Sequence, residues 1–277
     1  MNSSPADEAQ TPQDPYEPDD GPIRIRHRGP VFHFFWPFTR YAVTNFCAGF
    51  GQLFFLLFNR CIIIGRENVG TNRNTVLLPN HQSMIDGFLV GALVFFPRSL
   101  LQPGLLPWLP AAYENFFENP IMRWFSDNWK CIPVKKGRKD FGAMKRMEKC
   151  LRQGIMIVFP EGTRSRDGRL LPPRSGIGYV MLKTRPKAVP VCLDGMDRVL
   201  PIGAFLPRLF QTIYIWYGES PDLNEYYDMR HGREAAQGAI NRAFEDVKKM
   251  QRVLQRYRSY RRRLLAGKPF YFRLYAA

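Results

Sequence analysis

Short apolar runs that end in turn-forming residues recur through the middle of the chain. Runs of this kind are typical of strands buried in a sheet. Between them, apolar residues recur at helical spacing, as in residues 85–96. This alternation predicts an α/β fold in a single domain, with a mixed, largely parallel central sheet flanked by helices. The predicted strands are residues 61–65, 75–78, 131–134, 155–159, 188–193 and 212–217.

Residues 100–110 interrupt this pattern, because three prolines lie there among leucines and Trp108. Proline does not fit a regular helix interior, so the segment is predicted to be an apolar loop. Such a loop could line a tunnel beside an active site or could only cover the core.

The composition of the N-terminal part of the chain changes twice, from acidic to basic and aromatic and then to apolar. Residues 1–22 carry acids and no base, which predicts a disordered tail rather than a signal peptide. Basic and aromatic residues lead into an apolar stretch at 41–58, which would be about 27 Å long as a helix. This length is borderline for spanning a bilayer, and the flanking Arg40 and Arg60 favour a helix embedded in one leaflet. Residues 23–60 are therefore predicted to be a membrane-associating element, with a spanning helix or a buried core helix as alternatives.

The C-terminal part of the chain is basic and periodic. Apolar residues recur at helical spacing between 235 and 257, and from Lys248 to the end there are ten bases and no acid. Residues 231–277 are therefore predicted to form a basic amphipathic helix and tail, and residues 61–230 to form the main domain.

Charge and composition narrow the choice of partner. The formal net charge of +16 at pH 7 implies nucleic acid, an anionic membrane or a phosphate-bearing substrate. The 22 phenylalanines are bunched, which favours a surface for lipid. Five dispersed cysteines without a C-x-x-C pair indicate reduced thiols in a cytosolic compartment. The four histidines have no ligand spacing, so no metal site is expected.

The first candidate for chemistry follows the strand at 75–78, where His81 and Asp86 lie close together in the sequence. A carboxylate on one ring nitrogen of a histidine can hold the tautomer whose other nitrogen takes a proton from an alcohol. On one continuous helix the two residues would point about 140° apart, so the dyad requires a helix that starts at Ser83. The same residues also fit a capping box, in which Asp86 only binds backbone N–H groups. The residues alone leave both interpretations open.

A second charged loop, from Pro160 to Gly168, follows the strand at 155–159. Its arrangement is the same as that of the loop with His81, because polar residues again follow the carboxyl end of a buried strand. A basic turn at 135–139 follows the strand before it. Taken alone, such a charge run is typical of a solvated face.

These motifs together resemble those of the phospholipid/glycerol acyltransferase family, over about residues 61–221. The family pattern N-H-x4-D is matched by Asn80, His81 and Asp86. The pattern F-P-E-G-T-R-S is matched at every position of residues 159–165. The basic turn and a later V-P-V element at residues 189–191 also have counterparts in the family.

The sequence departs from the family in one element. Where the family often has F-K-x-G, the chain has Pro173, Arg174, Ser175 and Gly176. Positive charge and glycine are kept but the aromatic is lost, so the substrate can differ.

The resemblance implies transfer of a fatty acyl group from an acyl thioester to the hydroxyl of a lysophospholipid, with 1-acylglycerol-3-phosphate as the leading acceptor. In this role His81 takes the proton from the hydroxyl and Asp86 orients the imidazole, without an acyl-enzyme. Arg164 holds the acceptor's phosphate, with a salt bridge to Glu161 or Asp167 as the alternative. The implied substrate-binding residues are Glu161, Gly162, Thr163, Arg164, Lys136, Arg138 and Arg174.

No bound cofactor is expected, since acyl-CoA or acyl carrier protein serves as co-substrate. The expected partners are anionic membrane lipids at the cytoplasmic face of a membrane. Nucleic acid is not expected, because no recognition motif accompanies the C-terminal charge. Two alternatives remain: an acyltransferase for another lysophospholipid or hydroxylated lipid, and a non-catalytic protein that binds anionic membranes. The intact His81, Asp86 and Glu161 favour an enzyme.

Overall fold

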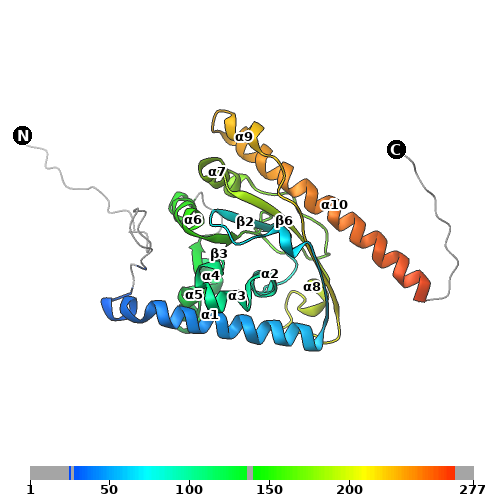
Figure 1. Cartoon of the computed structure of the whole chain (residues 1–277), viewed down its shortest axis with the longest axis horizontal. Coiled ribbons are helices and arrows are strands. Elements are labelled where there is room, and N and C mark those ends of the chain that lie inside the picture. The colour runs from blue at the N-terminus through cyan, green and yellow to red at the C-terminus, as the bar shows by residue number, and fades with distance from the viewer. Residues whose placement is uncertain (1–24, 26–27, 136–139, 266–277) are drawn as a thin grey trace, which may run out of the picture.

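The computed structural model describes Ile25, residues 28–135 and residues 140–265, the last four without their side chains (Figure 1). The acidic segment 1–22 and the predicted phosphate ligands Lys136 and Arg138 lie outside the described residues.

A five-stranded sheet forms the centre of the molecule, in the order β1-β7-β6-β2-β5. Neighbouring strands are parallel except β6 and β7, which are antiparallel. The prediction of a mixed, largely parallel sheet is therefore confirmed. The strands are β1 (Arg60–Ile64), β2 (Thr75–Pro79), β5 (Ile155–Ile157), β6 (Lys187–Asp194) and β7 (Thr212–Tyr217).

The strand predicted at 131–134 forms, but outside this sheet. It is β4 (Cys131–Val134), which pairs in parallel with β3 (Leu109–Ala112) in a separate two-stranded sheet. Trp108, just before β3, forms a parallel bridge with Met156 of β5, so the small sheet lies beside the edge of the large one. The proline-rich segment before β3 contains a 3₁₀ turn at Pro103–Leu105 and no long helix.

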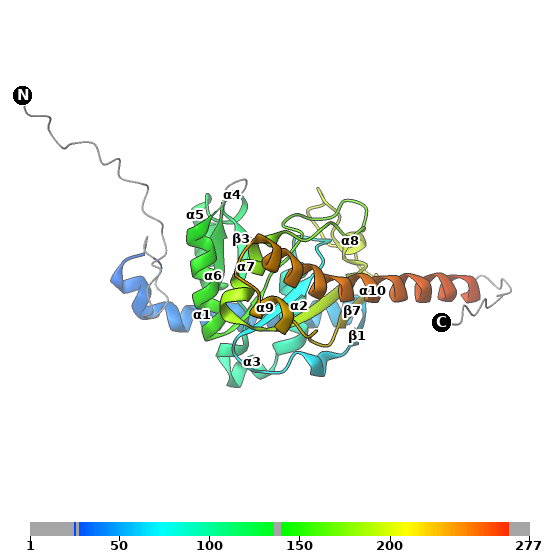
Figure 2. The same cartoon turned by 90° about the horizontal axis from the view of Figure 1, so that it is seen from above.

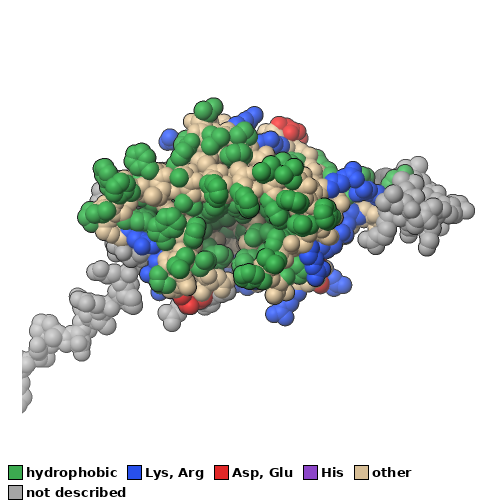
Figure 3. Space-filling model, turned by 90° about the horizontal axis from the view of Figure 1, so that it is seen from below, with side chains coloured by type: hydrophobic (Ala, Val, Ile, Leu, Met, Phe, Trp, Pro, Cys, Tyr) green, Lys and Arg blue, Asp and Glu red, His purple; other side chains and the backbone are tan. Residues whose placement is uncertain are grey.

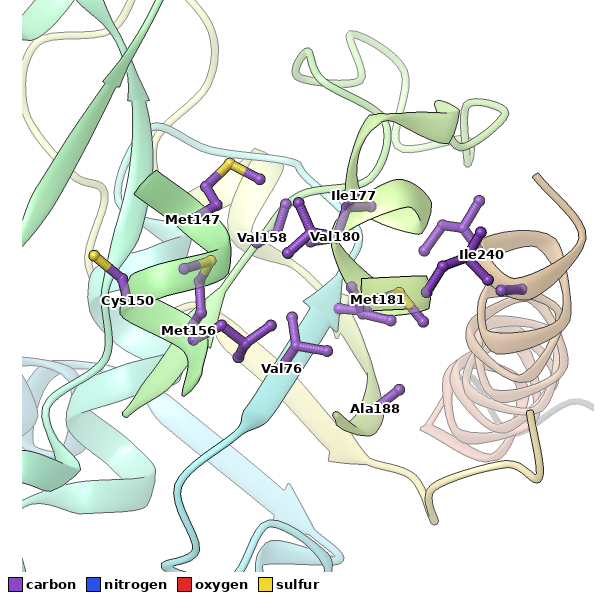
Figure 4. Packing of buried hydrophobic residues seen from close by; sticks show 14 of the residues in the cluster. Val76, Met147, Cys150, Met156, Val158, Ile177, Val180, Met181, Ala188 and Ile240 are labelled. Atoms are coloured by element: carbon purple, nitrogen blue, oxygen red, sulfur yellow. The ribbon is translucent and has the colours of Figure 1, made fainter. Parts of the chain in front are cut away.

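Helices cover both faces of the large sheet. Successive strand side chains point to opposite faces, and accordingly Val76 and Leu77 of β2 enter different hydrophobic clusters. Val76 packs with Met181 and Ile240 beneath α6 (Phe141–Gln153), α7 (Ser175–Thr184) and α10 (Arg233–Leu265), as Figure 4 shows. Leu77 packs with side chains of α2 (Asp86–Phe95). The shorter helices are η1 (Arg66–Asn68), α3 (Arg98–Leu101), α4 (Tyr113–Phe116), α5 (Pro120–Asn128), α8 (Met196–Val199) and α9 (Asn224–Asp228).

α10 is a core helix in its first half. Ala236, Ile240 and Val247 are fully buried there. Its C-terminal turns extend beyond the sheet, as the view from above shows (Figure 2). The predicted C-terminal amphipathic helix is therefore also part of the main domain's core.

α1 (Pro30–Phe58) is a continuous helix of 29 residues that runs along the lower edge of the domain (Figure 1). One side packs on the domain so closely that a Cβ at Gly51 would come within 1.9 Å of the Phe88 ring on α2. The other side is apolar and exposed, with Phe34, Phe46 and Phe50 each more than half exposed. Seen from below, hydrophobic side chains gather across this whole lower face (Figure 3). Among the described residues, α1 is the helix that is long and apolar enough to cross a membrane.

Candidate active site

The two motif loops leave the sheet at the same edge, because β2 and β5 are adjacent parallel strands. The N–H of Ser165, in the second loop, donates to the carbonyl of His81 in the first, at 2.8 Å. The two motifs found in the sequence are therefore in contact in the fold.

His81 and Asp86 form a hydrogen-bonded pair, with Nδ1 of His81 3.0 Å from Oδ2 of Asp86. The same Oδ2 accepts the N–H groups of Gln82 at 2.6 Å and Ser83 at 2.7 Å. The dyad and the capping interaction are thus present together. The predicted helix start at Ser83 is wrong, because α2 begins at Asp86 with Ile85 as its N-cap.

Burial controls the electrostatics of Asp86. The side chain is fully buried, and burial raises the pKa of its carboxyl, while His81 and the two backbone N–H groups oppose that rise. All these donors point at Oδ2, whereas Oδ1 is buried without a hydrogen-bond partner in the described part of the chain. The carboxyl is therefore held in place through one oxygen only.

The imidazole of His81 is supported on one face and open at one nitrogen. Its ring stacks on Phe159, with centroids 3.9 Å apart and planes 20° apart. The side chain is 18% exposed, and within residues 28–135 and 140–261 nothing bonds to Nε2. Nε2 therefore has no partner in that part of the chain, while Nδ1 is bonded to Asp86.

Glu161 joins the two loops through its carboxylate. Oε1 accepts the N–H of His81 at 2.9 Å, and Oε2 accepts the N–H of Leu171 at 2.8 Å. The side chain is buried, which raises the pKa of the carboxyl, and the two N–H groups oppose this rise. Both oxygens already have backbone partners, so Glu161 orders the loops here, and its predicted contact with substrate stays a prediction.

Arg164 has no ion-pair partner among the described residues. The acids proposed for a salt bridge are engaged elsewhere: Glu161 with backbone, and Asp167 with Ser165 at 3.1 Å and Arg169 at 3.4 Å. The half-buried guanidinium of Arg164 is therefore available to a ligand.

The predicted residues Gly162, Thr163 and Arg174 lie on one side of the second loop. Gly162 has φ +67°, a left-handed conformation that favours glycine. A Cβ at this position would also lie 3.2 Å from Cδ of Arg174. Thr163 and Arg174 are both exposed and line the same cavity.

Two amide side chains on either side of His81 were not assigned a role from the sequence. Asn80 pairs with the backbone of Leu193 on β6, donating through Nδ2 at 3.0 Å and accepting through Oδ1 at 2.7 Å. Oε1 of Gln82 accepts the N–H of Met196 at 3.1 Å. Both amides are buried, so they anchor the His81 loop to the end of β6. Asn80 was visible as the first residue of N-H-x4-D, but nothing in the sequence revealed its partner.

The described residues contain no group of three or more histidine, cysteine or acidic side chains placed to hold a metal ion. The five cysteines are free thiols.

Parts of this chain are similar in sequence to known proteins. The acyltransferase family model matches residues 60–194. A 1-acyl-sn-glycerol-3-phosphate acyltransferase of Cocos nucifera is 26% identical over 208 residues, covering 71% of this chain and 64% of that protein. A chloroplastic enzyme of the same name from Brassica napus is 28% identical over 151 residues, but the match spans only 41% of its length. A glycerol-3-phosphate acyltransferase of Haemophilus influenzae is 30% identical over 146 residues, with 17% of its length matched.

The fold has a counterpart among solved structures. The 1-acyl-sn-glycerophosphate acyltransferase PlsC from Thermotoga maritima superposes with a TM-score of 0.55 at 24% identity, covering 79% of this chain and 89% of that one. Residues 60–194 of this chain match the acyltransferase family, and the chain shows distant homology to the 1-acyl-sn-glycerol-3-phosphate acyltransferases.

Proposed function

We propose that this enzyme moves a fatty acyl group from an acyl thioester to the free hydroxyl of 1-acylglycerol-3-phosphate and so makes phosphatidate. The observation that carries the proposal is the His81 imidazole, bonded to Asp86 through Nδ1 and open at Nε2. The names of the matched relatives support this acceptor. Another lysophospholipid or hydroxylated lipid is the alternative acceptor. Labelled acyl-CoA supplied with a panel of lysolipids and glycerol 3-phosphate tests the proposal, which requires the highest kcat/KM for 1-acylglycerol-3-phosphate.

In the proposed mechanism, Nε2 of His81 accepts the proton of the hydroxyl as its oxygen attacks the thioester carbonyl. The tetrahedral intermediate collapses, the carbon–sulfur bond breaks, and the imidazolium returns the proton to the leaving thiolate. Asp86 stabilises the imidazolium between these two steps. No side chain becomes acylated, so the chain needs no nucleophile of its own.

A small apolar cavity of about 20 Å³ lies between α1 and α2, which is room for a water molecule and too little for a fatty acyl chain unless the surrounding segments move apart. Its walls include Ala48 of α1, Gly87 and Gly91 of α2, and Leu106 and Pro107. Gly87 directly follows Asp86, so this wall of the cavity lies next to the residue that orients the proposed base. The sequence left open whether the proline-rich segment lines a tunnel or only covers the core. Its residues Leu106 and Pro107 form part of this lining.

We assign the acceptor's phosphate to Arg164, whose guanidinium has no carboxylate partner in the described part of the chain. The predicted helpers Lys136 and Arg138 lie outside the described residues. A planar guanidinium can bind two phosphate oxygens at once, which a lysine cannot.

Replacing Arg164 by alanine is expected to raise the KM for 1-acylglycerol-3-phosphate about tenfold and to change kcat less, because a contact present in both ground and transition states is lost. Arg164→Lys should restore part of the affinity. Steady-state kinetics with each substrate varied in turn measures both effects, and the KM for acyl-CoA should change little.

A neutral acceptor, a monoacylglycerol, provides the control for this variant. Its slow turnover should be indifferent to the substitution. If Arg164→Ala lowered turnover of both acceptors equally and also lowered the Tm, Arg164 would be a structural residue and the phosphate would need another site.

We further propose that the lower face rests in one leaflet of an anionic membrane on its cytoplasmic side. The exposed side of α1 is continued by the loop after α8, where Phe205 is 94% and Phe210 82% exposed. The N–H of Phe210 donates to the carbonyl of Phe58, so this loop lies at the end of α1. Lysine and arginine side chains lie at one border of the apolar face, where lipid headgroups would meet them (Figure 3).

In this proposal the chain divides into an N-terminal tail (1–22), a membrane element (23–60), a catalytic domain (61–230) and a basic C-terminal helix and tail (231–277), of which the first half of the helix packs in the core of the catalytic domain.

Changing both Phe46 and Phe50 to serine is expected to weaken binding to anionic liposomes by at least about tenfold, since each phenylalanine buried in lipid contributes roughly 2 kcal/mol. Their rings stack on each other on the exposed side of α1, so the core is not disturbed. Flotation with liposomes measures the bound fraction.

Phe141→Ser is the matched control, because Phe141 is 65% exposed but begins α6, which lies above the lower face (Figure 1). High salt should leave much of the wild-type protein on the liposomes. Complete release by salt would show that the attachment is purely electrostatic and that the embedded helix is wrong.

A further inference from the structure

A second cavity lies between the 159–165 loop and the start of α10. It has a volume of about 440 Å³, within the range of small-molecule sites, and is open to solvent. Its polar lining comes from three separate segments of the chain: Glu161 and Thr163, then Arg174 and Ser175, then Arg233 and Gln237. Arg164 itself is not part of this lining, but its neighbour Thr163 is, so the cavity adjoins the position assigned to the acceptor's phosphate.

The charge of this cavity is positive. Arg174 and Arg233 both line it, and neither has a carboxylate partner in the portion of the chain that the structure describes. The acid in its wall, Glu161, is buried and already bonded to two backbone N–H groups. Two guanidiniums without a carboxylate partner, beside a carboxylate whose oxygens already accept backbone N–H groups, fit an anion with several oxygens, of which phosphate is the best match.

The walls of the cavity are tied to one another. The N–H of Arg174 donates to the carbonyl of Pro160 at 2.9 Å, and its side chain packs over Gly162. Nε2 of Gln237 donates to the carbonyl of Pro173 at 3.0 Å, which fixes α10 against the segment that carries Arg174. The two arginines are therefore presented from backbone positions that the surrounding hydrogen bonds hold.

We infer that this cavity binds a phosphate group of one of the two substrates, with Arg174 and Arg233 as its ligands. The inference rests on the proposed function, in which both substrates carry phosphate: the monoester of the lysolipid, or the phosphates of the CoA carrier. It assigns a substrate-binding role to α10, which lies outside the residues matched by the family model.

The test compares Arg174→Ala, Arg233→Ala and Arg233→Lys with Arg230→Ala in the full chain. Arg230 is an exposed arginine close to Arg233 in sequence but outside the cavity lining, so it controls for lost charge. Each alanine change in the cavity should raise one KM about tenfold with little change in kcat, and lysine should restore part of it. A raised KM for 1-acylglycerol-3-phosphate identifies the lysolipid phosphate. A raised KM for acyl-CoA, without a change for the acyl-pantetheine thioester, identifies the carrier phosphates.

Ligand binding without turnover separates this inference from the proposed reaction. The rise in Tm caused by one of two ligands, CoA or glycerol 3-phosphate, should be reduced in the cavity variants and kept in Arg230→Ala. That result would support phosphate binding in the cavity even if the wild-type enzyme acylated no lysophospholipid. The lack of acylation would then count against the proposed function alone. Equal ligand effects in all variants, no ligand effect in the wild type, or a lower Tm with both KM values unchanged would overturn the inference.

Discussion

Replacing His81 by alanine is expected to lower the rate of acyl transfer by about 10²–10⁴-fold, the range for a lost general base. The fold should survive, because the hydrogen bonds that join the two motif loops use the backbone of His81 and not its ring. Its N–H binds Glu161 and its carbonyl binds Ser165, and both groups remain in the variant. Asp86 also keeps its two backbone donors.

Turnover of 1-acylglycerol-3-phosphate with labelled acyl-CoA measures this effect, and circular dichroism with a thermal melt checks the fold. His231→Ala is the matched control, since His231 is exposed and distant in sequence from both motifs. If His81→Ala kept more than about a tenth of the wild-type rate, the proposed base would be wrong.

Asp86→Asn is expected to reduce kcat by a similar factor, roughly 10²–10⁴-fold, with little change in the KM for either substrate. The amide has nearly the same shape, and its single oxygen can accept the three donors that now point at Oδ2. Its NH₂ then takes the place of Oδ1, which has no partner among the described residues. Geometry is thus kept, while the negative charge that stabilises the imidazolium is removed.

The pH dependence of this variant's stability gives an independent check, because the direction of the expected change is defined. Burial raises the native pKa of Asp86 above its unfolded value, so the protonated form stabilises the native state at low pH. This contribution is lost as the pH rises through the native pKa. Asparagine does not titrate, so the variant should lack this component of the pH dependence in thermal melts. If the variant were much less stable at all pH values and its activity fell only in proportion to the fraction of folded protein, Asp86 would act mainly as a helix cap.

Local pattern was sufficient to predict the five strands of the large sheet, β4, and a polar loop after each of β2 and β5. A strand that ends in a polar turn is a local signal, and adjacent parallel strands must release their loops at the same edge of the sheet. The contact between Ser165 and His81 follows from that geometry.

Pairings between distant segments could not be predicted in this way. β4 was recognisable as a strand, but its partner β3 contains Pro110 and lies at the end of a segment that resembles a loop. Asn80 finds its partner Leu193 more than a hundred residues away. Such choices depend on tertiary packing, for which a single sequence holds no local signal.

Residue type alone also gave an incomplete picture of Glu161. A carboxylate in a functional motif suggests contact with substrate, but the fold gives both of its oxygens backbone partners. The sequence does not reveal this, because the N–H of Leu171 reaches Glu161 only through the way the loop folds.

The position of α1 along a single face has a consequence for membrane shape. On the orientation proposed above, the side of the helix that bears Phe46 and Phe50 inserts into one leaflet and adds area to that leaflet only. Strongly curved bilayers have looser headgroup packing on their convex side and accept such a wedge at lower cost. We therefore expect the enzyme to concentrate on small vesicles and tubules in preference to flat bilayers of the same composition, so that membrane geometry as well as lipid supply decides where it works.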